Sequence, residues 1–239
     1  MKLLVLNIGN TRAQYGVFSR GRIHEIRYFP TKELLARKRM PFLHDAKLPI
    51  VASTVVPEAR KILKKLKIRW FGRKSALPIS LRRVDSSTLG ADRMANAVAA
   101  VKFARLPAII VDCGTAITID AINSRKELIG GAILPGRTIL RRALNDYTAQ
   151  LPLVSVSQAR PRALGRNTIS AILSGTDLAV IGSVREIISG IIKEAGFRKC
   201  TILGVGGDAD YFIRNIPGMK SGGKDFTLRG IASCFGGAL

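Results

Sequence analysis

The sequence predicts an α/β protein: the order of its segments indicates the class, its composition excludes disorder, and an internal repeat indicates how the chain is organised. Apolar segments rich in β-branched residues recur along the chain, and Gly or Pro follows each of them before a longer helical pattern begins. Hydrophobic residues make up 47% of the 239 residues, which is enough apolar surface to offset the entropy lost on folding. A short motif near the start also recurs in mid-chain, which predicts a duplicated half.

The predicted elements of the first half are three strands and two helices. The strands are short apolar runs at 3–6, 13–18 and 50–53. The first helix, 58–68, places Ile62, Leu63 and Leu66 at helical spacing and leaves its lysines on the opposite face. The second, 92–104, is rich in alanine and has Asp92 at its start, where that residue would be a natural N-cap.

The second half repeats this mixture of strands and helices. Apolar runs predict strands at 108–112, 116–122 and 201–205, and helical patterns cover 138–145, 168–195 and 209–213. The helix 168–195 has apolar residues on more than one face, which is too many for a helix with one solvated side. No linker-like tract interrupts the chain, so two lobes, if the chain forms them, would pack closely.

The longest apolar stretches are short or interrupted by charge. Asp177, Arg185 and Glu186 divide the run 169–192, whereas a membrane-spanning helix needs about 20 nearly uncharged residues. The apolar run at 3–6 is shorter than a signal-peptide core. We therefore expect a cytoplasmic protein without a membrane partner. Three cysteines, far apart and without a CxxC pair, disfavour a disulfide framework or a zinc site.

The net charge is +23, from 39 Lys and Arg against 16 Asp and Glu, and it is unevenly distributed. Ten basic residues and no acidic one lie between Arg60 and Arg83. Such a stretch could bind a polyanion, but the helical spacing within 58–68 favours a solvated helix face, so nucleic acid is possible and not favoured. Trp70, beside Phe71, could stack on a base, although a buried anchor is the favoured interpretation.

The repeated motif carries the chemistry of phosphate binding. Residues 4–11 (LVLNIGNT) resemble 110–116 (IVDCGTA): each has an apolar strand, then Asn7 or Asp112, then Gly and Thr at a turn. Glycine lets backbone N–H groups approach a phosphate, Thr adds a hydroxyl, and a carboxylate can hold a cation shared with phosphate oxygens. One such turn alone is ordinary hairpin chemistry, whereas two facing turns would bind a nucleotide polyphosphate.

Eight motifs in order resemble one family, the type III pantothenate kinases, which include proteins described as Bvg accessory factors and belong to the actin-like ATPase superfamily. The motifs are NIGNTR (7–12), ASTVVP (52–57), GADR (90–93), DCGTA (112–116) with Thr118 and Asp120, GGAILPG (130–136), TAQLP (148–152), GRNT (165–168) leading to Ser174 and Gly175, and GGDA (206–209). The resemblance covers nearly the whole chain. It implies two actin-like, ribonuclease H-like lobes, 1–106 and 107–239, with a nucleotide cleft between them and a trailing helix that could cross back. It also implies a homodimer with 168–195 in its interface.

The resemblance also implies a reaction, in which ATP phosphorylates the primary hydroxyl of pantothenate in the first step of coenzyme A synthesis. Residues 7–14 would bind the ATP phosphates, and the candidate ATP-binding residues are Asn7, Gly9, Asn10, Thr11, Arg12, Thr115, Gly206 and Gly207. For Gly206 and Gly207, a plain turn from strand to helix is the alternative. Asp112 corresponds to the family's position for a monovalent cation, K⁺ or NH₄⁺.

The implied pantothenate site centres on the GADR motif. Asp92 would accept the hydroxyl proton as the catalytic base, and Gly90, Ala91, Asp92, Arg93 and Thr168 would bind the substrate. The alternative to a catalytic role is that Asp92 only caps the helix, although an N-cap requires neither Gly90 nor Arg93.

Four features depart from the family pattern. The family opens with Asp where this chain has Asn7, and a neutral amide oxygen is a weaker ligand for Mg²⁺. Segment 84–89 lacks the family's Tyr and Pro, Val205 replaces a Thr, and Arg137 replaces an apolar residue. The loss of a carboxylate where Mg²⁺ neutralises developing charge could remove several kcal/mol of transition-state stabilisation.

Three hypotheses follow from different functional classes. The chain is a working or slow pantothenate kinase; or it is a catalytically impaired relative that binds nucleotide as a sensor, as a partner subunit or as a kinase for a similar small hydroxylated acid; or it is an accessory factor that binds nucleic acid or another polyanion. Pantothenate-dependent ATP consumption, ATP binding without turnover, and salt-dependent DNA binding distinguish them in that order.

Overall fold

The computed structural model describes residues 2–38, 43 and 47–235, which form two compact units. Unit 1 contains the described residues of 1–106, 122–129 and 223–239, and unit 2 contains 107–121 and 130–222. Two segments that follow Leu106 in the sequence thus return to unit 1. The first is fixed by Ser80, whose N–H donates to Lys126 (2.9 Å) and whose carbonyl accepts from Leu128 (3.0 Å). The second contains the trailing helix.

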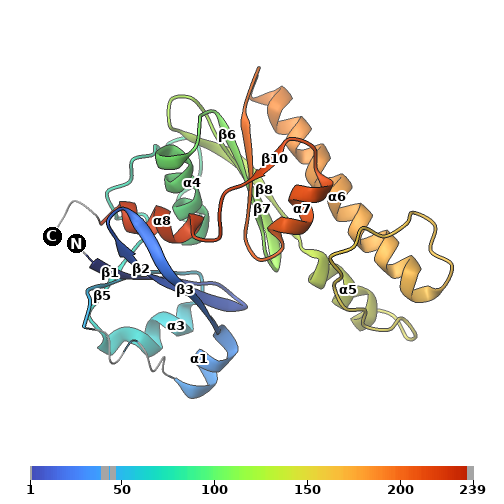
Figure 1. The fold of residues 1–239 in the computed structure, drawn as a ribbon, viewed down its shortest axis with the longest axis horizontal. Helices are drawn as coiled ribbons and strands as arrows, with labels where there is room; N and C mark the ends of the chain where they lie inside the picture. The colour runs from blue at the N-terminus through green and yellow to red at the C-terminus, as the bar shows by residue number, and fades with distance from the viewer. Residues whose placement is uncertain (1, 39–42, 44–46, 236–239) are drawn as a thin grey trace. The chain divides into compact units, whose positions relative to one another are not determined.

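Unit 1 is a five-stranded sheet with helices on both faces (Figure 1). Its strands are β1 (Lys2–Ile8), β2 (Arg12–Ser19), β3 (Arg22–Pro30), β4 (Ile50–Thr54) and β5 (Ile68–Trp70), in the order β3-β2-β1-β4-β5. β1 is antiparallel to β2 and parallel to β4. One face is covered by α1 (Thr31–Arg37), α3 (Pro57–Ile62) and the 3₁₀ turn η1 (Leu63–Lys65), and the other by α4 (Ala91–Phe103) and α8 (Phe226–Ser233).

Alternation along β1 sets which side chains face each helical layer. Leu4, Leu6 and Ile8 enter the core under α1 and α3. Because side chains alternate across a strand, Asn7 is on the opposite face, which α4 and α8 cover. The two covering helices pack tightly, since a Cβ on Gly230 of α8 would overlap the Ala95 carbonyl of α4.

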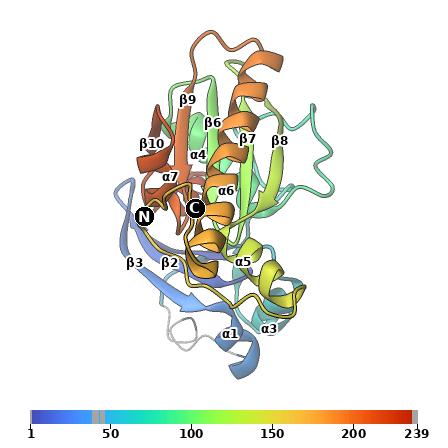
Figure 2. The same ribbon diagram turned by 90° about the vertical axis from the view of Figure 1, so that its right-hand side faces the viewer.

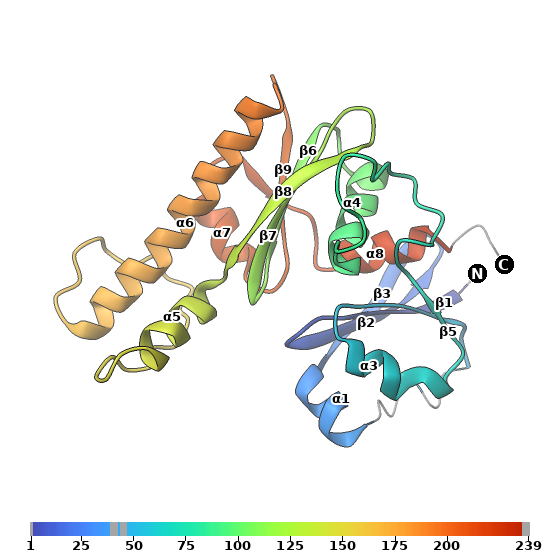
Figure 3. The same ribbon diagram turned by 180° about the vertical axis from the view of Figure 1, so that it is seen from behind.

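Unit 2 is built on a second five-stranded sheet. Its strands are β6 (Ala108–Cys113), β7 (Ala116–Ile122), β8 (Leu128–Pro135), β9 (Thr201–Val205) and β10 (Met219–Ser221), in the order β10-β9-β6-β7-β8. Figure 2 shows α6 (Thr168–Glu194) running along this sheet, where it packs with α7 (Ala209–Asn215) over the buried side of β6 and β7. α5 (Arg137–Asp146) follows the end of β8 (Figure 3).

The two sheets share one strand order. Taken from its other edge, the second sheet is β8-β7-β6-β9-β10, which matches β3-β2-β1-β4-β5 strand for strand. β1 and β6 occupy equivalent central positions and carry Asn7 and Asp112 next to their last residues. The predicted α/β class and the predicted duplication are therefore confirmed.

Several elements differ from the sequence-based expectation. The helix predicted over 58–68 is wrong at its end: it stops in η1, and Ile68 begins β5 because that strand pairs in parallel with β4. Asp92 is not the N-cap of α4, because Gly90 has that position. Strands β3, β8 and β10 and helix α1 were not predicted, whereas α8 is the predicted trailing helix that returns to unit 1. Among the described residues, none of the helices has the length and apolarity that crossing a membrane requires.

Candidate functional site

The turn between β1 and β2 is held from one side by the first residue of α1. The N–H of Gly9 donates to the Arg12 carbonyl (3.1 Å), which closes the turn. The buried Thr31 donates its hydroxyl to the Gly9 carbonyl (2.7 Å) and its N–H to the Thr11 carbonyl (3.0 Å). Asn10, Thr11 and Arg12 are exposed. These contacts fix a short glycine turn that exposes polar residues.

Asn7 lies beside this turn and is paired with Ser53. The two residues are register partners on the parallel strands β1 and β4, and the Ser53 hydroxyl donates to Oδ1 of Asn7 (2.7 Å). Ser53 is fully buried and Asn7 is half-buried. The amide oxygen, the atom that a cation would use, is therefore already a hydrogen-bond acceptor.

Asp92 lies in the first turn of α4. Its Oδ1 accepts a hydrogen bond from the Arg93 N–H (2.8 Å). Burial raises the pKa of the Asp92 carboxyl, and backbone hydrogen bonds and Arg93 only partly oppose this effect. A desolvated carboxylate with a raised pKa is a better proton acceptor than an exposed one.

Gly90 makes room for that carboxylate. A Cβ at position 90 would lie 2.6 Å from Oδ1 of Asp92 and 3.7 Å from the Val55 side chain. Val55 follows β4 directly, and its N–H donates to the Ile8 carbonyl at the end of β1 (3.2 Å). α4 thus begins at the carboxyl end of β1 and β4, and within unit 1 this brings the GADR motif to the sheet edge that carries Asn7 and Ser53.

Unit 2 holds the second glycine turn, between β6 and β7. Gly114, Thr115 and Ala116 are exposed, while Asp112 is half-buried. A Cβ on Gly206, whose φ is +92°, would overlap Oδ1 of Asp112. Because Asp112 pairs with Val205 across β6 and β9, the turn that contains Gly206 and Gly207 passes beside the Asp112 carboxylate. Three predicted residues of this unit, Asp112, Gly206 and Gly207, are therefore neighbours.

Thr168 stands apart from this group. It is the first residue of α6, exposed, and preceded by Asn167, which caps the helix in a capping box with Ser170. Its predicted role in substrate binding stays a prediction.

Sequence reasoning missed a buried ion cluster in unit 2. Arg137 and Arg141 of α5 contact Asp177 of α6, and Arg137 also contacts Asp208. The available signal was Arg137 itself, a charged residue directly after the GGAILPG motif. Ser53 was also missed as a partner of Asn7, although it lies inside the ASTVVP motif.

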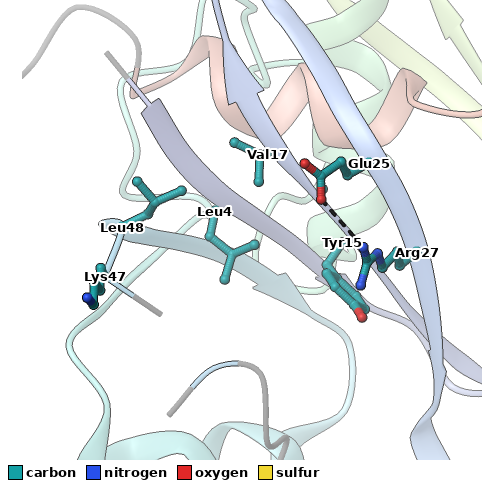
Figure 4. A pocket seen from close by; sticks show the side chains of 8 residues that line it. Leu4, Tyr15, Val17, Glu25, Arg27, Lys47 and Leu48 are labelled. Atoms are coloured by element: carbon teal, nitrogen blue, oxygen red, sulfur yellow. Dashed lines mark ion pairs between the residues drawn. The ribbon is translucent and has the colours of Figure 1, made fainter. Parts of the chain in front are cut away.

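Two cavities lie outside the predicted site residues. Figure 4 shows one of about 230 Å³ in unit 1, where Leu4, Tyr15 and Val17 lie near the ion pair of Glu25 and Arg27 (3.5 Å). The other, of about 530 Å³, lies along α6 in unit 2. Neither cavity is lined by a predicted phosphate-binding or catalytic residue. No cluster of three or more His, Cys, Asp or Glu suited to a metal occurs within the described ranges.

The basic stretch lies on the surface of unit 1. Arg60, Lys61, Lys64 and Lys65 are exposed, as expected for a solvated face. Trp70 is half-buried against the core under α3, and the Arg60 guanidinium lies 5.1 Å from its ring centroid. This packing agrees with the favoured anchor role and leaves one face of the ring covered.

Comparison with known proteins connects these units to one family. The family model for type III pantothenate kinase matches residues 3–190. The type III pantothenate kinase of Thermomicrobium roseum is 34% identical over 98% of this chain and 96% of its own length, and that of Flavobacterium johnsoniae is 31% identical over 98% and 97%.

Solved structures support the fold. A Baf family protein from Campylobacter jejuni has a TM-score of 0.66 at 21% identity, covering 98% of this chain and 97% of its own. The ethanolamine utilization protein EutJ from Carboxydothermus hydrogenoformans has a TM-score of 0.57 at 14% identity, covering 97% and 89%. These likenesses confirm the predicted actin-like ATPase fold. From the family match and the two relatives, the chain belongs to the type III pantothenate kinase family.

Proposed function

We propose that this protein transfers the γ-phosphoryl group of ATP to the primary hydroxyl of pantothenate. The main observation in support is the environment of Asp92. Its half-buried carboxylate has a raised pKa and occupies space that Gly90 leaves free at the carboxyl end of β1 and β4. Phosphoryl transfer requires little covalent chemistry from the protein, so positioning and a base for the hydroxyl are its main contributions. A similar small hydroxylated acid is the alternative acceptor.

Asp92 is the proposed catalytic base. Its Oδ1 is anchored by the Arg93 N–H, which fixes the carboxylate at the start of α4. In this role it accepts the proton of the substrate hydroxyl as that oxygen attacks phosphorus. Gly90, Ala91 and Arg93 are the proposed substrate contacts beside it, and Thr168 is a further one from α6.

The ATP phosphates are the proposed ligands of the glycine turns. In unit 1, Gly9 to Arg12 offer an exposed turn braced by Thr31. In unit 2, Thr115 and the pair Gly206 and Gly207 offer a second exposed segment beside Asp112. Bare backbone of this kind suits polyphosphate and the flat face of a nucleotide base.

Magnesium chemistry belongs to this family's use of ATP, but residue 7 does not fit Mg²⁺ as a direct ligand. Its only side-chain oxygen is neutral and already accepts the Ser53 hydroxyl. A hard dication prefers carboxylate, water or phosphate oxygens in near-ideal octahedral geometry. In this proposal, phosphate and water oxygens take the place of that ligand, and Asn7 is a weak position at most.

A monovalent cation, K⁺ or NH₄⁺, is proposed at Asp112. The donor set fits in kind, because a half-buried carboxylate oxygen lies beside the glycine turn that would carry phosphate oxygens. A cation there would neutralise charge between the carboxylate and the phosphates. Activity in K⁺ against Na⁺, with Asp112→Asn as the comparison, tests this assignment.

A cytoplasmic homodimer is the proposed assembly. Unit 2 exposes large apolar side chains near α5 and the start of α6, which are Ile133, Ile139, Tyr147, Leu153, Val156, Leu164 and Ile169. Exposed apolar groups gathered on one part of a chain are typical of interaction surfaces. Light scattering after size exclusion measures the mass, and a 25.9 kDa species at all concentrations would contradict the dimer.

A coupled ATPase assay with pantothenate and Mg²⁺ tests the proposed function. We expect ATP consumption that requires pantothenate and is lost in Asp92→Ala. Thermal stabilisation by ATP without turnover would instead support the impaired nucleotide-binding homologue. DNA binding that falls with salt and survives Asp92→Ala and Thr115→Ala would support the polyanion-binding alternative.

A further inference from the structure

Arg137, the first residue of α5, has a fully buried guanidinium group with a complete set of partners. Its Nε donates to Oδ2 of Asp208 (2.7 Å) and its Nη2 to Oδ1 of the same carboxylate (2.6 Å). Nη1 donates to the Ser157 carbonyl (2.7 Å) and to Asp177 (3.4 Å). The Tyr211 ring covers the group, with its centroid 3.6 Å from Cζ. A bidentate pair of this kind fixes both distance and angle between two chain segments.

The two segments that this pair joins both contact the turn at 113–115. Gly136 immediately precedes Arg137, and its N–H donates to the Thr115 carbonyl (2.9 Å). Asp208 immediately follows Gly206 and Gly207, and its N–H donates to the Cys113 carbonyl (2.9 Å). The turn at 113–115 is therefore hydrogen-bonded to both segments, and the Arg137–Asp208 ion pair joins these two segments to each other.

The backbone at Gly136 is packed tightly against the backbone of the turn. A Cβ at position 136 would lie 2.5 Å from the carbonyl oxygens of Gly114 and Thr115. A small displacement of the start of α5 would thus move the backbone of the turn. Because Asp208 uses both carboxylate oxygens on Arg137, a change at Arg137 would also release the segment that follows Gly207.

Stability alone is a poor explanation for this pair. Burying two charges costs about as much as their attraction returns, and an apolar residue of similar size is often as stable. Burial by itself lowers the pKa of Arg137, but the hydrogen bond and charge of Asp208, together with the charges of Asp177 and Tyr211, outweigh that effect and raise the pKa, so the guanidinium remains charged. The bidentate contact instead fixes the relative positions of the two segments that it joins.

We propose that the Arg137–Asp208 ion pair is a positioning device for the nucleotide, which keeps the turn at 113–115 and the Gly206–Gly207 segment in the arrangement that receives ATP. This inference rests on the proposed function, since it assigns ATP to these segments. Arg137 is a positioning residue and not a catalytic one, because its guanidinium is enclosed by protein groups.

A matched control lies one turn further along α5. Arg141 is equally buried, and its Nη2 donates to Asp177 (2.6 Å), but it contacts neither of the two segments. Arg141→Met therefore removes a buried ion pair, in this case a single contact and not a bidentate one, without releasing the turn. We expect it to lower the melting temperature and to leave the KM for ATP within about twofold of the wild-type value.

The test compares Arg137→Met with Arg141→Met in the full-length chain. We expect Arg137→Met to raise the KM for ATP by about 10-fold or more while the KM for pantothenate stays within about twofold, because displacement of a binding segment by a fraction of an ångström affects only its own ligand. Arg137→Lys keeps the charge without the bidentate geometry and should fall between the two. Asp208→Asn provides a second route if Arg137→Met fails to fold.

The readouts separate this inference from the proposed function. ATP-induced thermal stabilisation is measured on every variant beside the kinase assay. If the wild-type chain binds ATP but does not phosphorylate pantothenate, the proposed reaction fails, and the ATP shift of Arg137→Met alone decides the inference. The inference is overturned if the wild-type chain shows no ATP shift, or if Arg137→Met and Arg141→Met change ATP binding equally.

Discussion

The hydroxyl of Ser53 donates a 2.7 Å hydrogen bond to Oδ1 of Asn7, and the two residues share one register position on β1 and β4. The equivalent position in unit 2 pairs Asp112 with Val205 on β6 and β9. One repeat thus sets an amide against a hydroxyl, and the other sets a carboxylate against an apolar residue. The amide leaves unit 1 without a negative charge where unit 2 has one.

Asn7→Asp should increase turnover. A carboxylate at this position can accept the Ser53 hydroxyl with one oxygen and offer the other to a cation on the ATP phosphates. We expect kcat to rise by about 10- to 100-fold at saturating ATP and the Mg²⁺ requirement to fall, because the added charge acts on the transferred phosphoryl group. The measurement is kcat across a Mg²⁺ titration.

Asn7→Ala serves as the comparison for that variant. It removes the amide without adding a charge, so a gain shared by both substitutions would mean that the amide merely obstructs the site. Unchanged kcat in Asn7→Asp would show that residue 7 does not influence the metal.

Asp92→Asn should abolish activity without destabilising the fold. The amide oxygen can still accept the Arg93 N–H, so the start of α4 keeps its hydrogen bond. The proton acceptor is lost, and general-base contributions of this kind are about 10²- to 10⁴-fold in rate. Steady-state kinetics and a melting curve check both parts. Activity near the wild-type level would reject Asp92 as the base.

The pH dependence of Asp92 has a defined sign. Burial raises its pKa in the folded protein above the usual 3.8, so activity should fall with acid at a pH higher than an exposed Asp would give. For stability, a raised carboxylate pKa means that ionisation costs free energy in the fold. That cost is absent below about 3.8 and grows as pH rises through the folded-state pKa.

Two measurements check this sign. The acid limb of kcat/KM reports the pKa of the free enzyme. Urea unfolding of the wild type and Asp92→Asn should show a stability difference that favours the Asn variant and widens with increasing pH. A difference that narrows instead would contradict the raised pKa.

Gly90→Ala should damage catalysis more than folding. The new Cβ would lie 2.6 Å from Oδ1 of Asp92, so the carboxylate must move. The backbone at Gly90 has φ of −58°, which alanine adopts freely. We expect kcat/KM for the acceptor to fall by about 10-fold or more with a small change in melting temperature. Gly72→Ala is the control, because a Cβ there meets nothing within 4 Å.

Much of this fold could be predicted because its central strands are buried apolar runs. β1, β4, β6 and β9 lie in the middle of their sheets and read clearly in the sequence. The missed strands lie at sheet edges, where β3 is largely exposed and β8 contains two glycines, so neither shows a clear apolar pattern. α1 has only seven residues, too few for a periodic signal.

The candidate site was also predictable only in part. The glycine turns and the GADR motif could be found because they are continuous in the sequence. The contacts of Asn7 with Ser53 and of Arg137 with Asp208 join residues separated by 46 and 71 positions. Such pairs depend on strand register and helix placement, which no local pattern encodes.

Gly206→Ala should remove ATP binding, and its effect can be separated from backbone strain. Gly206 has a φ of +92°, and a Cβ would lie 2.7 Å from the Cys113 carbonyl as well as overlapping the Asp112 carboxylate. Gly218 has a similar φ of +78° with nothing within 4 Å, so Gly218→Ala carries strain of about 1 kcal/mol without crowding. We expect both variants to lose melting temperature and only Gly206→Ala to lose ATP-induced stabilisation. Calorimetric titration with ATP measures the difference, and retained affinity in Gly206→Ala would remove this segment from the nucleotide site.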